Sequence, residues 1–467
     1  MTGSAHPYMA NSAAGSMQAL LDVVGVSSAE ELFAQIPAAH RGDSNIVPSA
    51  GIRSEQQLRR MLEDRLRGGI STESHVSFLG GGYWKHYVPA LCDEIASRPE
   101  ISTSVWGTPS SDHGRNQAWF EFASQLGALL DLEFVGLPVY SWGCAVGHAV
   151  RMAARMNGRS VVVVPSNLDR ERRLVVDTYC GYSELNGAVT VREVAVDAAT
   201  GMISLDALAA AVTDEVAAVY IETPNSWGVV EADIARMIEL THDSGAQAIV
   251  GVDPIALGSL ASPADFGADI LVGSIQPLGI HLNAGGGVGG FIATRDEEVY
   301  ARQFPTLQVS IAPTTREGEH AFGLTLFAQS SYGSRELGND WTGNSVYLWA
   351  VRAAVYLALL GPQGMHELAD TVVANARRTA ELIDELDGVS VRYRDSIFKE
   401  FIVDFSATGK SVEQINAGLL ARGVLGGHDL TGSHDGLDGC ALYCVTEVIS
   451  EDDVHHLLGA LAEVIAA

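Results

Sequence analysis

Short apolar runs alternate with amphipathic stretches through the middle of the chain. The runs predict β-strands at 133–140, 160–164, 188–196, 217–222, 248–252 and 269–273. Apolar residues at helical spacing predict helices at 116–132, 145–156, 204–212 and 232–244. Strands that alternate with helices form a parallel sheet with helices on both faces, so this pattern predicts a large α/β domain.

The two ends of the chain have a different pattern. Residues 1–77 are polar and helical, with breaks at Pro37 and Pro48, and we expect them to form a helical arm. Residues 78–344 make up the large domain. Residues 345–467 predict two linking helices, 345–360 and 364–386, separated at Gly361-Pro362. A small C-terminal α/β domain follows, with strands at 389–393, 400–405 and 441–445 and helices at 412–422 and 451–465.

Composition and charge exclude several classes of protein. The 467 residues are 47% hydrophobic and 18% charged, which is ordinary for a globular enzyme. A net charge of −28 argues against nucleic acid or an anionic membrane as a partner. No apolar run is long enough to span a membrane, and the N-terminus lacks the features of a secretory signal. The five cysteines are scattered, without zinc-site spacing, so we expect a cytoplasmic protein with reduced thiols and no metal.

The strongest candidate chemistry lies at the end of the strand 248–252. Asp253 follows this strand, and the carboxyl ends of parallel strands line the ligand crevice of an α/β sheet. In pyridoxal-phosphate enzymes an Asp pairs with the pyridinium nitrogen, and a Lys forms the Schiff base. That Lys would follow the next strand, 269–273, but Ser274-Ile275-Gln276-Pro277 occupies the place. Asp253 could equally be a turn residue before Pro254, and both interpretations stay open.

Other candidates would complete such a site. Asn225 follows the strand 217–222 and is expected to face the same crevice. A turn of small residues before the helix 145–156 is suited to a cofactor phosphate, with Ser141, Gly143 and Cys144 as its candidate ligands. Possible bases are His113, His281 and Lys85.

A set of segments distributed over most of the chain is specific to one family. These segments are VSFLGGGYWKHYVPA (76–90), TPNSWGVVE (223–231), VDPIALGSL (252–260), GADILVGSIQPLGI (267–280), YLALLGPQG (356–364), FKEF (398–401) and CVTE (444–447). Together they resemble the glycine cleavage system P-protein family, and within it subunit 1 of decarboxylating glycine dehydrogenase.

The resemblance implies a fold and a function. The fold would be that of fold-type I pyridoxal-phosphate transferases: a mainly parallel sheet in the large domain and a smaller C-terminal α/β domain. The activity would be glycine decarboxylation, with transfer of the aminomethyl group to the lipoyl H-protein. In the two-subunit form, subunit 1 lacks the Schiff-base lysine, and subunit 2 supplies it and holds the cofactor. Gln276 agrees with this role, because an amide cannot form an imine.

Three segments depart from the family pattern: the loop 328–345, Trp142-Gly143-Cys144, and residues 108–116. They leave two alternatives open. The chain could be a repurposed stand-alone enzyme that binds pyridoxal phosphate non-covalently and acts on another small amino acid, or a non-catalytic scaffold subunit. Lysine is scarce, with Lys85, Lys399 and Lys410 the complete set. A lysine within bonding reach of Asp253 would contradict the interpretation as a dependent subunit.

Overall fold

The computed structural model describes residues 6, 8–42, 52, 54–101, 109–181, 188–283, 288–325, 346–434 and 436–467. For residues 10, 14, 109–114 and 325 it describes the backbone alone. The chain divides into two compact units, residues 1–70 and residues 71–467, and each is considered by itself.

The first unit consists of short helices. They are η1 (Ala10–Ser12), α1 (Ala14–Val24), η2 (Ala29–Phe33), η3 (Ala38–His40) and α2 (Glu55–Leu66). Ser54 caps α2, and its side chain accepts a hydrogen bond from the Gln57 amide. None of the described residues of this unit is buried, and apolar side chains such as Leu20 and Leu62 are exposed.

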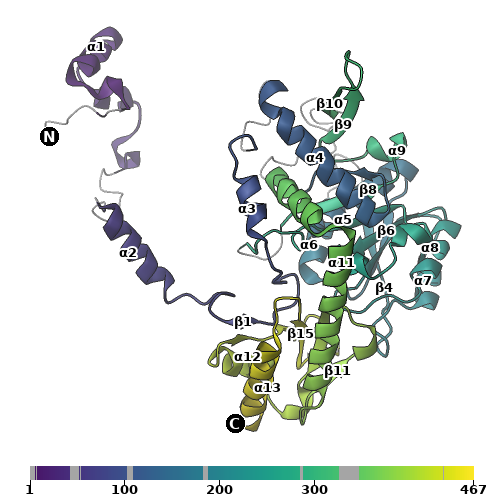
Figure 1. The fold of residues 1–467 in the computed structure, drawn as a ribbon. Helices are drawn as coiled ribbons and strands as arrows, with labels where there is room; N and C mark the ends of the chain where they lie inside the picture. The colour runs from purple at the N-terminus through teal and green to yellow at the C-terminus, as the bar shows by residue number, and fades with distance from the viewer. Residues whose placement is uncertain are drawn as a thin grey trace. The chain divides into compact units, whose positions relative to one another are not determined.

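The second unit is built on a seven-stranded sheet with the order β2-β8-β7-β6-β5-β3-β4 (Figure 1). Strands β3 to β7 run parallel, whereas β8 and β2 are antiparallel to their neighbours. The prediction of a mainly parallel α/β sheet is therefore confirmed. The strands are β2 (Phe134–Val135), β3 (Val161–Pro165), β4 (Thr190–Val194), β5 (Val216–Thr223), β6 (Gln247–Val252), β7 (Ile270–Ser274) and β8 (Gly290–Thr294).

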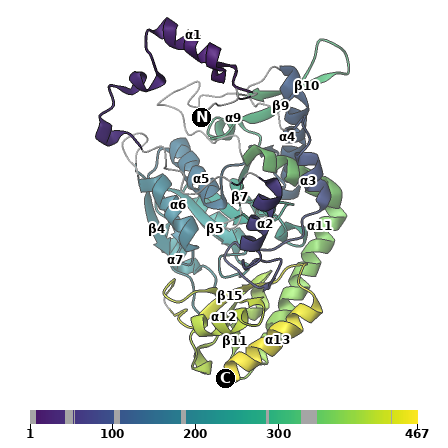
Figure 2. The ribbon, with the colours of Figure 1, turned by 90° about the vertical axis from the view of Figure 1, so that its left-hand side faces the viewer.

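Side chains of the central strands alternate between two cores, because successive residues of a strand point to opposite faces. In β3, Val161 and Val163 pack into the core that contains α4 (Pro109–Leu130) and α8 (Ile234–Asp243). Val162 and Val164 pack into the core formed with α5 (Trp142–Asn157) and α6 (Arg170–Gly181), which lie together in Figure 2. Helices thus cover both faces of the sheet, which explains why its strands are almost wholly apolar.

Two long helical segments link the large sheet to the C-terminal domain. The helix α11 (Tyr347–Asp384) is interrupted at Gly361, whose φ of 59° and ψ of −176° are not helical, and Pro362 follows. The break predicted at this position is confirmed. The first half of α11 packs against α4, and the helix runs on to the C-terminal domain (Figure 1). Its second half carries Ala376, Ala380 and Ile383 into the C-terminal core.

The C-terminal domain has a four-stranded antiparallel sheet with the order β11-β12-β15-β14. Its elements are β11 (Ser390–Arg392), β12 (Glu400–Asp404), α12 (Val412–Leu420), β13 (Val424–Leu425), β14 (His428–Asp429), β15 (Cys440–Cys444) and α13 (Glu451–Ala466). The short strand β1 (Val76–Ser77) pairs with β13.

Some elements differ from the sequence prediction. The strand expected at 133–140 is only two residues long, and the helix α6 was not predicted. Also not predicted were the hairpin β9 (Gln308–Pro313) and β10 (His320–Thr325), and the helix α3 (Ala90–Ala96). Other short elements are α7 (Leu205–Ala211), α9 (Glu298–Ala301), η4 (Ala256–Gly258), η5 (Pro263–Phe266), η8 (Arg394–Ser396) and η9 (Ser406–Thr408).

Candidate functional site

The carboxyl ends of β5, β6 and β7 bring three predicted residues to one edge of the sheet. Asp253 directly follows β6, Asn225 follows β5, and Gln276 follows β7. Asp253 is only 3% exposed, and its Oδ1 accepts a hydrogen bond from the Ile255 amide at 3.0 Å. The parallel register of the strands accounts for this placement, as expected for an open α/β sheet.

A lysine lies against Asp253. The Nζ of Lys399 is 2.5 Å from the Asp253 Oδ2, and the Lys399 side chain is 3% exposed. The contact is an ion pair. Lys399 directly precedes β12, so the C-terminal domain supplies the positive charge. A lysine within bonding reach of Asp253 is the condition stated above as contradicting a dependent subunit, and Lys399 meets that condition by distance.

The position of Lys399 differs from that of a Schiff-base lysine. In an enzyme of this chemistry the Asp carboxylate binds the ring nitrogen, while the lysine bonds to the aldehyde carbon on the opposite side of the ring. An ammonium group in contact with the Asp takes the place of the nitrogen. Lys399 and a cofactor would therefore compete for Asp253, and proximity alone does not make Lys399 a tether.

Asn225 is buried, and its side chain shapes the turn after β5. Its Nδ2 donates to the Gly201 carbonyl at 2.9 Å and to the Glu231 carboxyl group at 3.0 Å. Its Oδ1 accepts from the amides of Trp227 at 3.0 Å and Val229 at 3.2 Å. Because these bonds use the amide group fully, Asn225 has a structural role at the wall of the crevice.

The predicted phosphate turn is closed by its own residues. Ser141 caps α5, and its Oγ accepts from the Cys144 amide at 3.2 Å. Gly143 is packed so tightly that an added Cβ would lie 3.0 Å from Val175. Trp142 follows the cap, and the Arg172 guanidinium lies 4.5 Å from its ring centroid. The turn thus has the form of an anion site, but its Cys144 amide already donates to Ser141.

Three other candidates share a cavity of about 560 Å³, lined by Gln276, His281 and Lys85 among others. Gln276 is buried, and its Nε2 donates to the Ile280 carbonyl at 2.9 Å. Lys85 pairs with Glu73 at 3.2 Å, and His281 contacts Asp93 at 2.8 Å.

The remaining candidates from the sequence lie wholly or partly outside the described residues. The backbone of His113 lies in α4, but its side chain is outside the described residues, as is the loop 328–345. No cluster of three or more His, Cys, Asp or Glu that could hold a metal ion occurs in the described part of the chain. The described helices include none long and apolar enough to cross a membrane.

Space at the strand ends decides whether pyridoxal phosphate fits. Pockets for small molecules typically enclose about 300 Å³ or more. The cavity beside Asp253 and Lys399 measures about 20 Å³, room for about one water molecule. The adjoining cavity at Ser141 and Gly143 measures about 130 Å³. The larger cavity of about 560 Å³ that Gln276 also lines does not have Asp253 in its wall. With Asp253 paired to Lys399 and no lysine at position 276, the residues of this chain do not fit the cofactor.

Sequence reasoning missed a buried cluster next to this site. Arg172 pairs with Glu222 at 2.9 Å, and the Tyr220 hydroxyl donates to Glu222 at 2.7 Å. Burial raises the pKa of Glu222, against the lowering effect of Arg172 and Tyr220. Arg172 belongs to the unpredicted helix α6, so its partner could not be identified from the sequence pattern.

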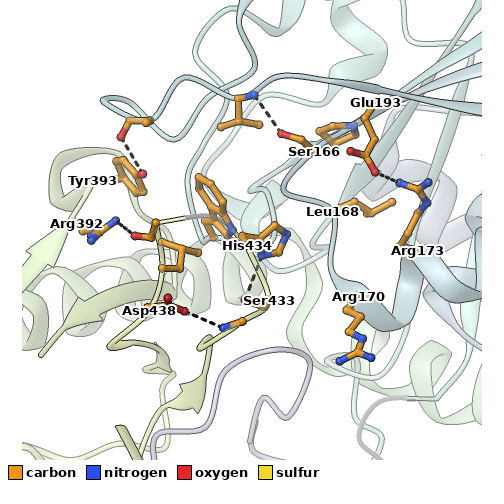
Figure 3. A pocket seen from close by; sticks show the side chains of 17 residues that line it. Ser166, Leu168, Arg170, Arg173, Glu193, Arg392, Tyr393, Ser433, His434 and Asp438 are labelled. Carbon is orange, nitrogen blue, oxygen red and sulfur yellow. Dashed lines mark hydrogen bonds and ion pairs between the residues drawn. The ribbon is translucent and has the colours of Figure 1, made fainter. Parts of the chain in front are cut away.

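A larger cavity, of about 700 Å³, lies elsewhere, between the ends of β3 and β4 and the C-terminal domain (Figure 3). Its charged groups are mostly paired: Arg173 with Glu193, and Arg392 with Asp404. Arg170 also lines it, without a dashed contact in Figure 3. Because Arg173 and Arg392 are each paired with a carboxylate, Arg170 is the one arginine of this wall without an ion pair among the described residues, and the cavity lacks the converging polar groups of a reaction centre.

Comparison with known proteins places these observations in a family. The family model of the glycine cleavage system P-protein matches residues 7–461. The probable glycine dehydrogenase (decarboxylating) subunit 1 of Saccharolobus islandicus (strain L.S.2.15 / Lassen #1) is 32% identical over 464 residues, covering 98% of each chain. The protein of the same description from Sulfolobus acidocaldarius is 31% identical over 462 residues, covering 98% of this chain and 99% of its own.

Solved structures are similar to this chain as well. A glycine decarboxylase (P-protein) of the glycine cleavage system, crystallised in an inhibitor-bound form, superposes with a TM-score of 0.85 at 29% identity, covering 99% of this chain and 100% of its own. The sphingosine-1-phosphate lyase of Burkholderia pseudomallei, at 14% identity and a TM-score of 0.63 over 92% of this chain and 94% of its own, shares the fold. The fold is therefore that of fold-type I pyridoxal-phosphate enzymes, and the chain belongs to the glycine cleavage system P-protein family.

Proposed function

We propose that this chain is subunit 1 of a two-subunit glycine decarboxylase, active only with a partner that carries the Schiff-base lysine and holds pyridoxal phosphate. One observation carries the proposal: a buried Gln276, and no lysine, follows β7, where the resemblance implies the Schiff-base lysine of a catalytic chain. The full-length similarity to proteins described as subunit 1 supports the same assignment. Glycine would be the substrate, and the lipoyl H-protein would receive the aminomethyl group.

The stand-alone alternative requires a crevice that admits the cofactor without a covalent bond. The cavity of about 20 Å³ beside Asp253 argues against it. The scaffold alternative differs from the proposal only in whether this chain contributes to turnover, and a reconstituted activity assay separates the two.

Exchange of labelled bicarbonate into glycine tests the proposal. The assay compares this chain, a lysine-bearing subunit 2 homologue and their mixture, each with lipoyl H-protein and pyridoxal phosphate. We expect exchange from the mixture and at least tenfold less from either chain alone. Exchange by this chain alone contradicts the proposal. Full exchange by the partner alone assigns this chain to the scaffold class.

Gln276→Lys is the companion variant. Restoring the lysine does not restore the crevice, so we expect this chain to remain inactive alone even with an amine at position 276. Gln276→Met controls for loss of the hydrogen bond to Ile280. Exchange activity in the lysine variant alone would show that the missing amine was the sole obstacle.

A further inference from the structure

Lys399 is a deeply buried cation that sequence reasoning did not place. Its side chain is 3% exposed, and Asp253, its partner, is also 3% exposed. A buried charge is stable only when it is paired, since burial of an isolated ion costs several kcal/mol. The 2.5 Å ion pair meets that requirement on one side of the ammonium group.

Two further groups complete the surroundings of the ammonium. The Nζ lies 3.6 Å from the ring centroid of Trp84, a close cation–π contact. It is also 3.2 Å from His86 Nε2. Carboxylate, indole face and imidazole therefore enclose the charge, which is the arrangement of a binding site for a small cation.

The hydrogen bonds of His86 have a defined direction. An ammonium group only donates, so Nε2 of His86 accepts from Lys399 and its Nδ1 carries the proton. That Nδ1 lies 2.8 Å from Glu447 Oε2, to which it donates. Burial acts to raise the pKa of Glu447, but His86 and the Tyr87 amide lower it overall, so Glu447 is a carboxylate. The series of contacts from Glu447 through His86 to Lys399 and Asp253 leaves each charged group with a partner.

We infer that Lys399 is a built-in occupant of the cofactor-type crevice, its ammonium group standing at Asp253 in place of a cofactor's cationic ring nitrogen. The crevice is thus closed by a side chain of this chain itself, and the absent lysine at position 276 is only one of two barriers to the cofactor. The inference rests on the contacts of Lys399 and does not depend on the proposed function.

Removing the occupant should open a cation site. In Lys399→Ala, Asp253 and the Trp84 face remain, while the three outer methylene groups and the ammonium group, equivalent to n-propylammonium, are gone. We expect a lower melting temperature than wild type, and recovery of at least half of the loss by n-propylammonium chloride but not by sodium chloride at equal ionic strength. Lys410→Ala removes a lysine outside this cluster and should respond to neither salt. Failure of the amine to recover the variant overturns the inference.

A second pair of variants covers the case in which the alanine variant does not fold. Lys399→Met and Asp253→Asn each leave one buried group without its partner, whereas the double variant leaves no unpaired charge. We expect the double variant to melt at a higher temperature than either single variant. Additive losses in melting temperature would show that the two side chains do not form the pair described.

The wild-type chain provides the direct test. After incubation of the full chain with pyridoxal phosphate and removal of free cofactor, we expect no retained imine absorbance. After subsequent reduction with borohydride and peptide mapping, we expect no modified Lys399. Stoichiometric cofactor, or a label on Lys399, overturns the inference. This readout needs no partner chain, so its failure is distinguishable from failure of the exchange assay.

Discussion

At the scale of single residues, the turn after β5 holds a buried acid. Glu231 is 2% exposed and accepts hydrogen bonds from Asn225 at 3.0 Å and from the Ile203 amide at 3.1 Å. Burial raises its pKa to about 7 from 4.5, although both hydrogen bonds act in the opposite direction. Glu231 therefore titrates near neutral pH without belonging to the crevice.

The sign of its effect on stability follows from proton binding. Between pH 4.5 and about 7 the folded chain holds a proton that the unfolded chain has released, so the free energy of unfolding falls as the pH rises through this window. The total fall is about 3 kcal/mol. In Glu231→Gln this fall is absent, so the variant should gain up to about 3 kcal/mol on wild type between the two ends of the window.

Denaturant titrations at the two ends of that pH window measure the difference. Glu100→Gln, a change of an exposed acid, controls for the loss of one charge. If wild type and Glu231→Gln lose stability in parallel as the pH rises, Glu231 is not the group responsible.

Single residues also show where sequence reasoning stops. Asp253 and Gln276 could be placed at the crevice because each follows a strand that its own apolar run reveals. Lys399 could not be placed at the crevice in this way. Its contact with Asp253 joins two domains, and such a contact does not affect the spacing of apolar residues near Lys399 in the sequence. Its motif, FKEF, was recognised as a family segment, but the side chain's direction depends on tertiary packing.

At the scale of elements, the apolar parallel strands and the break at Gly361-Pro362 were predictable. A strand buried on both faces is a continuous apolar run, as in β3 and β6. The helix α6 begins with Arg170, Glu171, Arg172 and Arg173. Because this first turn is entirely charged, the apolar spacing that would predict a helix is not apparent in the sequence. In the hairpin of β9 and β10 Gln308 is the only buried side chain among the described ones, so the hairpin lacks the alternation that marks a half-buried strand.

One glycine controls the joint between β5 and the C-terminal domain. Gly228 has a φ of +83°, and an added Cβ would overlap the Glu400 carbonyl oxygen. Its own carbonyl accepts from the Phe398 amide at 3.3 Å. The glycine therefore allows both a left-handed turn and a close approach of two backbones.

Gly228→Ala should destabilise the chain by about 3 kcal/mol or more, the sum of backbone strain and overlap. Gly409→Ala is the matched control, since Gly409 has a φ of +73° with nothing within 4 Å of its Cβ position. That variant should lose only about 1 to 2 kcal/mol, from strain alone. Denaturant midpoints measure both losses, and equal losses would show that the backbone overlap is relieved.

At the scale of the whole molecule, the two units differ in how they are stabilised. The unit of residues 71–467 contains several buried clusters, whereas no described residue of the unit 1–70 is buried. Helices of 11 and 12 residues, the lengths of α1 and α2, are marginal in water without tertiary packing. The first unit thus has local structure but, among its described residues, no core of its own.

We accordingly expect an isolated segment of residues 1–70 to lose its far-ultraviolet helical signal gradually on heating. Residues 71–467 should unfold in a cooperative transition, because their cores are continuous across helices and sheets. Circular dichroism of the two segments tests this. A sharp transition of the first segment at a midpoint independent of concentration would contradict it.

The line of contacts from Asp253 to Glu447 has a mechanical consequence. Lys399 and Glu447 belong to the C-terminal domain, whereas Asp253 belongs to the large one, and His86 lies in the segment between β1 and α3. Movement of one domain away from the other would break the ion pair between Lys399 and Asp253. We therefore expect this line of contacts to hold the large domain and the C-terminal domain together, so that the two move as a single rigid body.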